Sequence, residues 1–421
     1  MKRKILLIFG VIILLFAVGC TKNKKSSKPV VLKMALWAAN DYEYFTETKP
    51  IVQAYKEKHP NVTIELEKFK DTEDYENAMK IRNSANELPD LMPLKPYMLV
   101  NFKDVMLPLN DLKAAKNNLY ASQYGVEGNV LGIPTTSFNE FVYYRKSIFN
   151  ELGLSVPKTW PEFLELTKKI KANGKYIPIA LGAKDVWPDY PFNEFMPCLE
   201  ANDGAYWNVM ATQDEPFTKD KSFYKAYAKI KQLYDLKPFG SAPLGVSFDQ
   251  SAQIFIAKKA AMLAAGQWFK VGNYEAGGGD SEDLGIFYLP ARASDSEPFI
   301  ATAMADGFYG IPKDSENIEA AKEFIEWFFT DYYSDFVNTM KLYPTMKDVT
   351  LDDPFWQQAA DALGSQKIDY VVYDGGGIEF TRIKDAISFD VKRLGQEMLT
   401  GADFDKMMDD LNKKWKAAKN K

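Results

Sequence analysis

The sequence predicts an α/β protein of more than one domain, on three observations. The chain has 421 residues, which at about 100 to 200 residues per domain corresponds to two or three domains. Apolar residues make up 46% of the chain and charged residues 26%, a balance typical of a chain that buries a core. From residue 30 onward, strand-like and helix-like segments alternate, and this alternation favours a largely parallel sheet covered by helices.

The first elements after residue 30 predict a βαβ unit. An extended run over 30–37 is followed by a helical pattern over 50–59, and alternating residues over 62–66 predict a second strand. The crossover of such a unit is nearly always right-handed. The alternation continues with a polar helix, a short strand and a third helix, which we expect over 72–86, 89–92 and 97–105.

The middle of the chain contains two extended segments that are too short for helices. They cover 131–136 and 141–144 and are rich in β-branched and aromatic residues, so we expect them to cross between domains. Beyond them Thr159 is a fair N-cap, and Glu162 has the capping-box spacing from it. A strong amphipathic helix is therefore expected to begin here.

The second half of the chain is expected to be mostly helical around a buried strand. The spacing is helical throughout 187–234, and 260–265 reads as a strand despite its alanines, since context overrides propensity. Apolar residues again share one helical face after residue 314, and a last helix is expected over 404–415. The glycine run at 277–279 lacks the Lys-Ser/Thr of a phosphate loop, so we expect a surface loop there.

Composition argues against several classes of partner and site. Lys and Arg total 52 against 57 Asp and Glu, a formal charge of −5, so we expect no nucleic-acid partner. The sequence has one His, His59, and two Cys, Cys20 and Cys198, which supply a zinc site or a Cys/His catalytic pair poorly. We therefore expect no metal and no cofactor, and a structural role for His59 at a helix end.

The first twenty residues read as an export signal. A basic start at 2–4 precedes an apolar run over 5–18 that is shorter than a comfortable membrane span. The small residues before Cys20 resemble the lipobox of bacterial lipoproteins, which implies cleavage before Cys20 and lipid attachment to its sulfur. We expect a signal peptide over 1–19 and a polar, basic, lipidated tether over 20–29 at the extracytoplasmic face of the membrane. An ordinary signal peptide with an incidental Cys is the alternative.

Four sequence blocks, in the right order, resemble the family 1 extracellular solute-binding proteins, the sugar receptors of bacterial ABC importers that include maltodextrin-binding protein. The blocks are Pro89-Asp90-Leu91; Gly132-Ile133-Pro134 with Tyr143-Tyr144-Arg145-Lys146 and Pro157 to Phe163; Lys259 to Met262 with Gly266-Gln267-Trp268; and Ala305 to Phe308 with Ala320 to Ile325. The similarity extends over roughly residues 31 to 415. Arg145 and Ser147 depart from the family's usual Asn and Asp, at positions outside the expected ligand cleft.

The resemblance implies two α/β lobes, built from non-contiguous segments, that close on a ligand by a hinge. We expect an N-terminal lobe from 30–136 plus about 286–330, and a C-terminal lobe from 137–285 plus about 331–421. Such a protein is not an enzyme: it holds a carbohydrate, here expected to be an oligosaccharide, and its closed form is recognised by the permease. We expect a monomer.

Candidate ligand contacts follow from the ends of strands and from the resemblance. Trp268 follows the strand over 260–265, and Trp187 follows an apparent strand over 177–181, at the edge where open α/β sheets place their ligands. Both also match aromatic binding positions of the family. The remaining candidates are polar or aromatic residues near strand ends, the crossover or the returning hinge segment: Trp37, Asp41, Lys95, Asn139, Glu140, Asp185, Asp306, Phe308 and Phe380. Each has a plainer alternative as a core, turn or solvated residue.

Other functions stay open at this point. A receptor for a peptide or an amino-acid derivative would need a cationic side chain against a carboxylate, and Lys95 is the candidate. A surface glycoside hydrolase would need two carboxylates about 5 to 10 Å apart, a role imaginable for Asp185 with Asp306. A purely structural lipoprotein would show no ligand-dependent closure.

Overall fold

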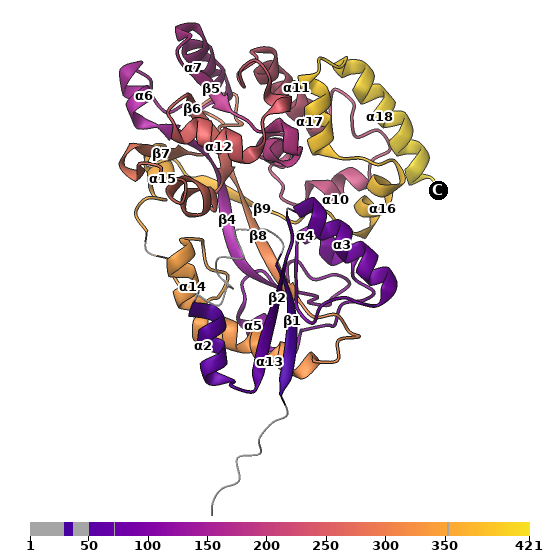
Figure 1. The fold of residues 1–421 in the computed structure, drawn as a ribbon. Helices are drawn as coiled ribbons and strands as arrows, with labels where there is room; N and C mark the ends of the chain where they lie inside the picture. The colour runs from indigo at the N-terminus through magenta and orange to yellow at the C-terminus, as the bar shows by residue number, and fades with distance from the viewer. Residues whose placement is uncertain (1–28, 37–49, 71, 352) are drawn as a thin grey trace, which may run out of the picture.

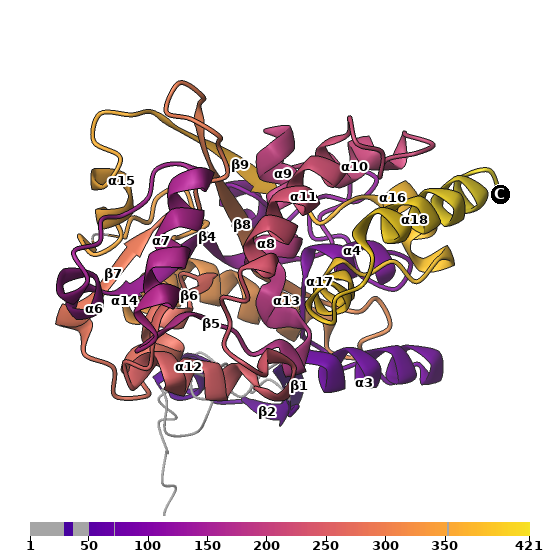
Figure 2. The ribbon, with the colours of Figure 1, turned by 90° about the horizontal axis from the view of Figure 1, so that it is seen from above.

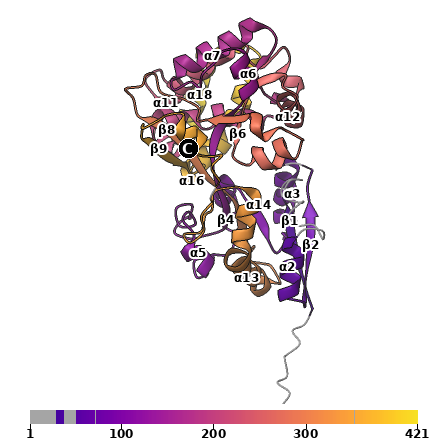
Figure 3. The same ribbon diagram turned by 90° about the vertical axis from the view of Figure 1, so that its left-hand side faces the viewer.

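Two long antiparallel strands, β4 (Ile133–Arg145) and β8 (Phe299–Gly310), connect the two halves of the molecule. The computed structural model describes residues 29–36, 50–70, 72–351 and 353–421. Figures 1 and 3 show two lobes, one above the other, with these strands running between them. The expected two-lobed α/β fold is confirmed.

The main sheet has seven strands, and β4 and β8 lie at its centre. The path is β3-β8-β4-β6-β5, with β7 paired to β4 and β9 paired to β8. One half of β4 pairs with β8, and its other half pairs with β6 and β7. The strands around this central pair are β3 (Met92–Leu94), β5 (Ile177–Ala180), β6 (Ala260–Gly266), β7 (Leu284–Phe287) and β9 (Ile368–Tyr373).

The first lobe contains the expected βαβ unit. Strands β1 (Val30–Leu36) and β2 (Val62–Lys68) pair in parallel, and helix α2 (Pro50–Lys58) connects them. Leu32 and Ile51 are fully buried in a core with Phe324. The other helices of this lobe are α3 (Thr72–Ala85), α4 (Pro96–Asn101), α5 (Lys113–Asn117), α13 (Ile318–Trp327) and α14 (Tyr333–Met340), with the π-helical turn η6 (Phe328–Tyr332) between the last two.

In the second lobe, helices cover both faces of the parallel pair β5 and β6. Met262 packs in one core with helix α7 (Trp160–Asn173), while the next residue, Leu263, packs in another with helix α12 (Phe248–Ile256). Figure 2 looks down on this lobe. Its other helices are α6 (Lys146–Glu151), α8 (Tyr190–Asn193), α9 (Met196–Ala201), α10 (Tyr206–Ala211), α11 (Ser222–Asp235), α15 (Gln358–Asp361), α16 (Ile378–Ala386), α17 (Val391–Leu399) and α18 (Phe404–Lys419). Short helical turns are η1 (Ala183–Asp185), η2 (Trp187–Asp189), η3 (Pro243–Gly245), η4 (Lys270–Glu275) and η5 (Ser281–Asp283).

Three local expectations need correction. The two extended segments at 131–136 and 141–144 are one strand, β4, because its two ends find partners in different lobes. The helical pattern over 187–234 is broken into four short helical segments, three of them with a proline as second residue, followed by the 14-residue helix α11. Thr159 caps α7 as expected, but the Glu162 carboxylate accepts from the Lys158 amide and so does not close the capping box.

Packing at two segments differs from the expected lobe bounds. Ile286 and Tyr288 pack in the core of the second lobe with Phe141, although we assigned them to the first. Tyr333 and Phe336 pack in the first lobe, although we assigned them to the second. Both segments lie close to a crossing of the hinge, where hydrophobicity does not tell which core a side chain enters. The rest of the division stays a prediction.

Candidate ligand-binding site

Trp187 and Trp268 lie side by side in the second lobe. Their ring centroids are 5.9 Å apart with an interplanar angle of 56°, and both rings are half-buried. Phe248, at the start of α12, packs against both, with centroids 4.6 Å from Trp187 and 5.5 Å from Trp268. The two tryptophans follow β5 and β6, which are parallel neighbours and so end at the same edge of the sheet.

The position of Trp268 depends on the glycine before it. A Cβ atom at Gly266 would lie 2.5 Å from Trp268 Nε1 and 3.0 Å from a ring atom of Phe138. No side chain fits at that distance, so the indole rests directly on the backbone at the end of β6. The same contact places Phe138 of the crossing strand β4 beside Trp268.

A strained residue holds Trp187 in place. Val186 has φ 66° and ψ −55°, close to the rare γ-turn conformation, which a β-branched residue adopts at a cost of about 1 to 3 kcal/mol. On one side the Asp185 carboxylate accepts a hydrogen bond of 2.7 Å from the backbone amide of Phe248, and on the other Pro188 follows Trp187. The expected ligand contact of Asp185 is therefore replaced, at one oxygen, by a bond that anchors α12.

Glu140 is buried beside the tryptophans and has an oxygen without a partner. Tyr190 donates to Glu140 Oε2 at 2.9 Å and accepts from the Gly266 amide at 2.9 Å, while Glu140 Oε1 has no hydrogen-bond partner. Glu140 is 7% exposed, and this burial raises the pKa of its carboxyl well above the ordinary value. The network connects the crossing strand β4 to the end of β6.

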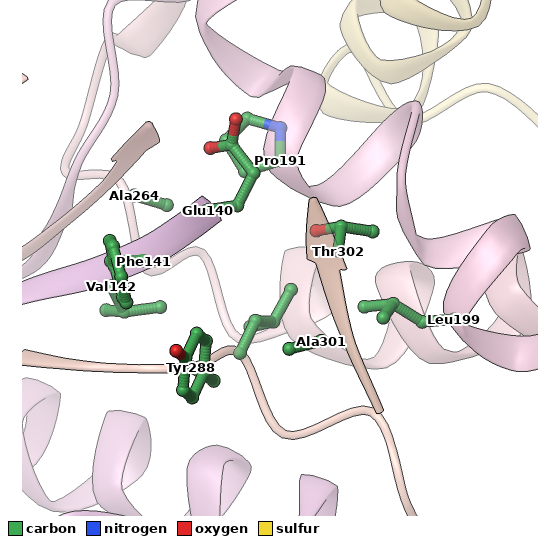
Figure 4. A pocket seen from close by; sticks show the side chains of 10 residues that line it. Glu140, Phe141, Val142, Pro191, Leu199, Ala264, Tyr288, Ala301 and Thr302 are labelled. Atoms are coloured by element: carbon green, nitrogen blue, oxygen red, sulfur yellow. The ribbon is translucent and has the colours of Figure 1, made fainter. Parts of the chain in front are cut away.

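A small internal cavity adjoins Glu140. Figure 4 shows Glu140 pointing toward Pro191 of α8, with Thr302 of β8 nearby. The free volume of this cavity is about 10 Å³, which is room for one water and too little for a sugar. A second, open hollow, lined by Tyr224 and Phe404 among others, lies on α11 and the start of α18.

Asp306 and Glu140 lie on the same face of the crossing strands. Thr136 is opposite Asp306, and Glu140 is four residues beyond Thr136, so strand alternation puts all three side chains on one face. Asn139 lies on the other face and donates to the Tyr288 hydroxyl at 3.3 Å. Neighbours in a strand point to opposite faces, so the Asn139 and Glu140 side chains are directed away from each other, and the ligand contact expected of Asn139 stays a prediction.

The Asp306 carboxylate forms an ion pair with Lys95 at the end of β3. Lys95 Nζ lies 2.7 Å from Asp306 Oδ2, and the two side chains are 23% and 11% exposed. Asp306 Oδ1 has no hydrogen-bond partner. The two residues, which are 211 positions apart and are separate candidates in the sequence analysis, are brought together by the fold.

Residues that sequence reasoning missed lie at the same junction between the lobes. The Tyr97 hydroxyl donates to Glu76 of α3, and the pKa of Tyr97 is raised by burial and by the charges of Glu76, Glu194 and Asp306. Glu194 follows α8 in the second lobe, so carboxylates from both lobes surround this tyrosine. Tyr97 lies two residues after Lys95 and could have been found from the end of β3; Glu76 and Glu194 lie on helical segments that no strand-end rule marks.

Glu194 is itself held by two neighbours from the second lobe. Tyr373, at the end of β9, donates to Glu194 Oε1 at 2.5 Å, and Lys392 Nζ of α17 lies 3.4 Å from Glu194 Oε2. The Tyr373 backbone carbonyl accepts from the hydroxyl of Tyr124, which belongs to the first lobe. The junction therefore contains direct hydrogen bonds between the lobes.

Two predicted aromatic contacts are wrong. Phe308 has no exposed surface and packs in the core of the first lobe, with its ring 5.0 Å from that of Tyr124. Phe380 is 5% exposed and stacks on Trp207 at 5.3 Å in the core of the second lobe. Phe308 was chosen from its position in the returning hinge segment and Phe380 from the family resemblance, and neither shows the direction of a side chain.

Other predicted residues lie elsewhere or outside the described residues. Trp37, Asp41 and Cys20 fall in the ranges that the structure leaves out. Arg145 is fully buried and pairs with Asp283 at 2.7 Å, with Ser147 bonded to the same carboxylate.

The described residues contain neither a helix that could span a membrane nor a cluster of metal-binding side chains. No described helix is long and apolar enough to cross a membrane. In the same part of the chain no group of three or more His, Cys, Asp or Glu side chains is arranged to hold a metal ion.

Comparison with known proteins gives the family. A model described as bacterial extracellular solute-binding protein matches residues 39–332. The multiple sugar-binding protein of Streptococcus mutans is 24% identical over 326 residues, covering 74% of each chain. The melibiose/raffinose/stachyose-binding protein of Bacillus subtilis is 22% identical over 335 residues, covering 77% of this chain and 76% of the relative.

Solved structures show the same fold. A chitin oligosaccharide binding protein superimposes with a TM-score of 0.77 at 20% identity, over 93% of this chain and 99% of the other. An ABC-transporter binding protein of Bifidobacterium animalis subsp. lactis in complex with mannobiose gives 0.76 at 19% identity, over 94% and 95%. Because the family model matches more than half of the chain, and these folds coincide over nearly all of it, the protein belongs to the bacterial extracellular solute-binding proteins.

Proposed function

We propose that this protein is an extracytoplasmic carbohydrate receptor that holds an oligosaccharide between its lobes and delivers it to an ABC-transporter permease. One observation supports this most: the half-buried Trp187 and Trp268 lie next to a buried network in which Glu140 Oε1 lacks a hydrogen-bond partner. A pyranose has apolar C–H faces and a rim of hydroxyls, so it needs aromatic surfaces and hydrogen-bonding groups close together.

The two kinds of group have separate tasks in this proposal. The tryptophan rings would pack against the apolar faces of the sugar, and the backbone at Gly266 would keep the Trp268 ring from moving away from the sugar. The unpaired oxygens of Glu140 and Asp306 would accept hydroxyl hydrogens. A hydrogen bond to the Asp306 carboxylate contributes about 1.5 to 3 kcal/mol, and one to the buried Glu140 carboxyl, whose pKa is raised, about 0.5 to 1.5 kcal/mol. Binding thus satisfies groups that the ligand-free protein buries at a cost.

Closure would follow from the connection between the lobes. The strands β4 and β8 cross from one lobe to the other, so a small change along them reorients whole lobes. A sugar shifts the molecule toward the closed form only if it binds that form more tightly than the open one. We propose that the sugar does this by contacting Trp268 in one lobe and Asp306 on the crossing strand.

Names of the relatives support a sugar ligand, and the N-terminus supports a membrane anchor. The relatives above are named for sugars, and one solved neighbour holds raffinose. We propose that the protein acts as a monomer anchored by a lipid on Cys20, and that it binds its ligand without turning it over.

The competing functions receive less support from the described residues. A receptor for a carboxylate-bearing peptide or amino-acid derivative would use Lys95, but its ammonium group already contacts Asp306 at 2.7 Å. A glycoside hydrolase would use Asp185 and Asp306, but Asp185 accepts a backbone hydrogen bond at the start of α12. Lys95 and Asp185 are thus already engaged by groups of the protein itself.

A thermal-shift screen tests the proposal. A ligand that binds only the folded state stabilises it and so raises the melting temperature. The free energy of stabilisation grows with the ratio of the ligand concentration to Kd. We expect a shift with at least one series of oligosaccharides and none with amino acids or short peptides. A shift with peptides alone would overturn the sugar assignment, and release of smaller sugars from a bound oligosaccharide would overturn the receptor assignment.

A further inference from the structure

We infer that the groups at the lobe junction select the ligand by charge: the site takes sugars that offer hydroxyl or amino donors and rejects sugars that carry carboxylate, phosphate or sulfate groups. This inference rests on the proposed function, and it adds a class of substrate to it. We call the four carboxyl groups at this place, Glu76, Glu140, Glu194 and Asp306, the acidic junction. Burial raises the pKa of Glu140, so Glu140 acts here as a hydrogen-bonding group, and the carboxylates of Glu76, Glu194 and Asp306 repel an anion.

Contacts from both lobes define the acidic junction. Tyr97 of the first lobe donates to Glu76 and is close enough to Glu194 and Asp306 for their charges to act on it. Lys95 pairs with Asp306 and Lys392 pairs with Glu194. Four carboxyl groups thus face two ammonium groups, and each ammonium group already has a carboxylate partner.

Two buried oxygens at this junction lack a hydrogen-bond partner and point to a ligand. Glu140 Oε1 and Asp306 Oδ1 are both unpaired, in residues that are 7% and 8% exposed. A buried carboxylate oxygen needs a donor, because an unpaired buried polar group carries a desolvation cost. Hydroxyl and ammonium groups are donors, whereas a carboxylate, phosphate or sulfate offers acceptors only.

Guanidinium groups that would bind an anion are engaged elsewhere in the described residues. Anionic ligands are best recognised by the paired donors of an arginine. The described arginines form ion pairs with Glu67, Asp283, Asp295, Glu379 and Asp390, through Arg82, Arg145, Arg292, Arg382 and Arg393 respectively. An anionic sugar would therefore meet the carboxylates of the acidic junction without a compensating arginine.

Matched sugars test the inference on the purified full-length mature protein. Calorimetry at low salt would compare trisaccharides that share a backbone: cellotriose, its glucosamine form and its glucuronate form; mannotriose and its mannuronate form; galactotriose and its galacturonate form. On the backbone that binds, we expect the neutral or amino sugar to bind at least about ten-fold more tightly than the uronate, since juxtaposed like charges are strongly unfavourable.

The outcomes separate this inference from the proposed function. Equal or tighter binding of a uronate would overturn the charge selection while leaving a sugar receptor. Absence of binding by every sugar, in these series and in the wider screen, would overturn the proposed function and the inference with it.

Charge-neutral variants identify the groups responsible. Asp306→Asn and Glu194→Gln should each reduce the ratio of neutral to uronate affinity by several-fold, because each removes one negative charge and keeps the shape of the side chain. Glu165→Gln is the matched control, since Glu165 is 61% exposed on α7 and pairs with Lys168. A ratio that stays constant in both junction variants, with melting temperatures showing intact folds, would overturn the assignment to the acidic junction.

Discussion

The ion pair between Arg145 and Asp283 should make the stability of the second lobe depend on acid. Asp283 accepts bonds from Arg145 at 2.7 Å and from the Ser147 hydroxyl at 2.8 Å, and Lys258 lies 2.8 Å away. Burial alone would raise the pKa of Asp283, but these partners outweigh it and lower the pKa to about 2. The Asp283 carboxylate is therefore more stable in the folded protein than in the unfolded chain.

The magnitude follows from the size of this shift. A fall from the ordinary 3.8 to about 2 corresponds to about 2.5 kcal/mol, at about 1.4 kcal/mol per pKa unit. Because the folded pKa is the lower one, this stability is fully present above pH ~4 and is lost as the pH falls toward ~2. Asp283→Asn should destabilise the protein at pH 7 by about 3 to 5 kcal/mol, because it leaves buried Arg145 without an anion.

Urea unfolding followed by tryptophan fluorescence at pH 7, 5, 4 and 3 measures both effects. The difference in unfolding free energy between wild type and Asp283→Asn should shrink by about 1 kcal/mol from pH 7 to pH 3, which is roughly half of the stabilisation that the ionised Asp283 carboxylate gives at pH 7. Asp410→Asn is the control, since the Asp410 side chain is 49% exposed and its ion pair with Lys413, at 3.4 Å, is longer and more exposed than that of Asp283 with Arg145. A gap that is the same at pH 7 and pH 3 would refute the reasoning.

Three further predictions concern the ligand site. Trp268→Ala should weaken sugar binding at least about ten-fold in calorimetry, or about 1.4 kcal/mol, whereas Phe380→Leu should lower stability and leave affinity unchanged; unchanged affinity in the first variant would remove Trp268 from the site. Glu140→Gln should weaken sugar binding, yet it should raise the melting temperature of the ligand-free protein above that of wild type, and by more at pH 8 than at pH 5. The reason is that the wild-type protein loses stability as the pH rises, because the pKa of the Glu140 carboxyl is higher in the folded protein than in the unfolded chain. An increase in melting temperature that is the same at both pH values would contradict this. Val186→Gly should relieve the strained turn and weaken sugar binding by loosening Trp187, and an unchanged Kd would show that the turn does not position the ring.

The sequence predicted well the features that follow from local pattern. The parallel pair β1 and β2, the polar helix α3, the buried strand β6 and the Thr159 cap lie where periodicity and capping residues placed them. Hydrophobic periodicity reports directly on local conformation, which explains these successes. The long run over 187–234 was misread because prolines and turns divide it without changing its apolar spacing.

The candidate site was predicted only in part, because orientation is a tertiary property. Parallel neighbours end at the same edge, so Trp187 and Trp268, each chosen because it follows a strand, lie side by side, and their contact with a ligand stays a prediction. Phe308 and Phe380 were misplaced because position in the sequence does not show which core a ring enters.

By itself, the sequence determined the α/β class, the resemblance to a family and the presence of a tryptophan after each of two strands, since these depend on composition, periodicity and motif order. Only the tertiary structure decided which groups meet at the lobe junction. Lys95 and Asp306 are 211 residues apart, and Glu76 and Glu194 come from different lobes. Their proximity, and the lack of partners for Glu140 Oε1 and Asp306 Oδ1, come from how β4 and β8 cross between two separately packed cores.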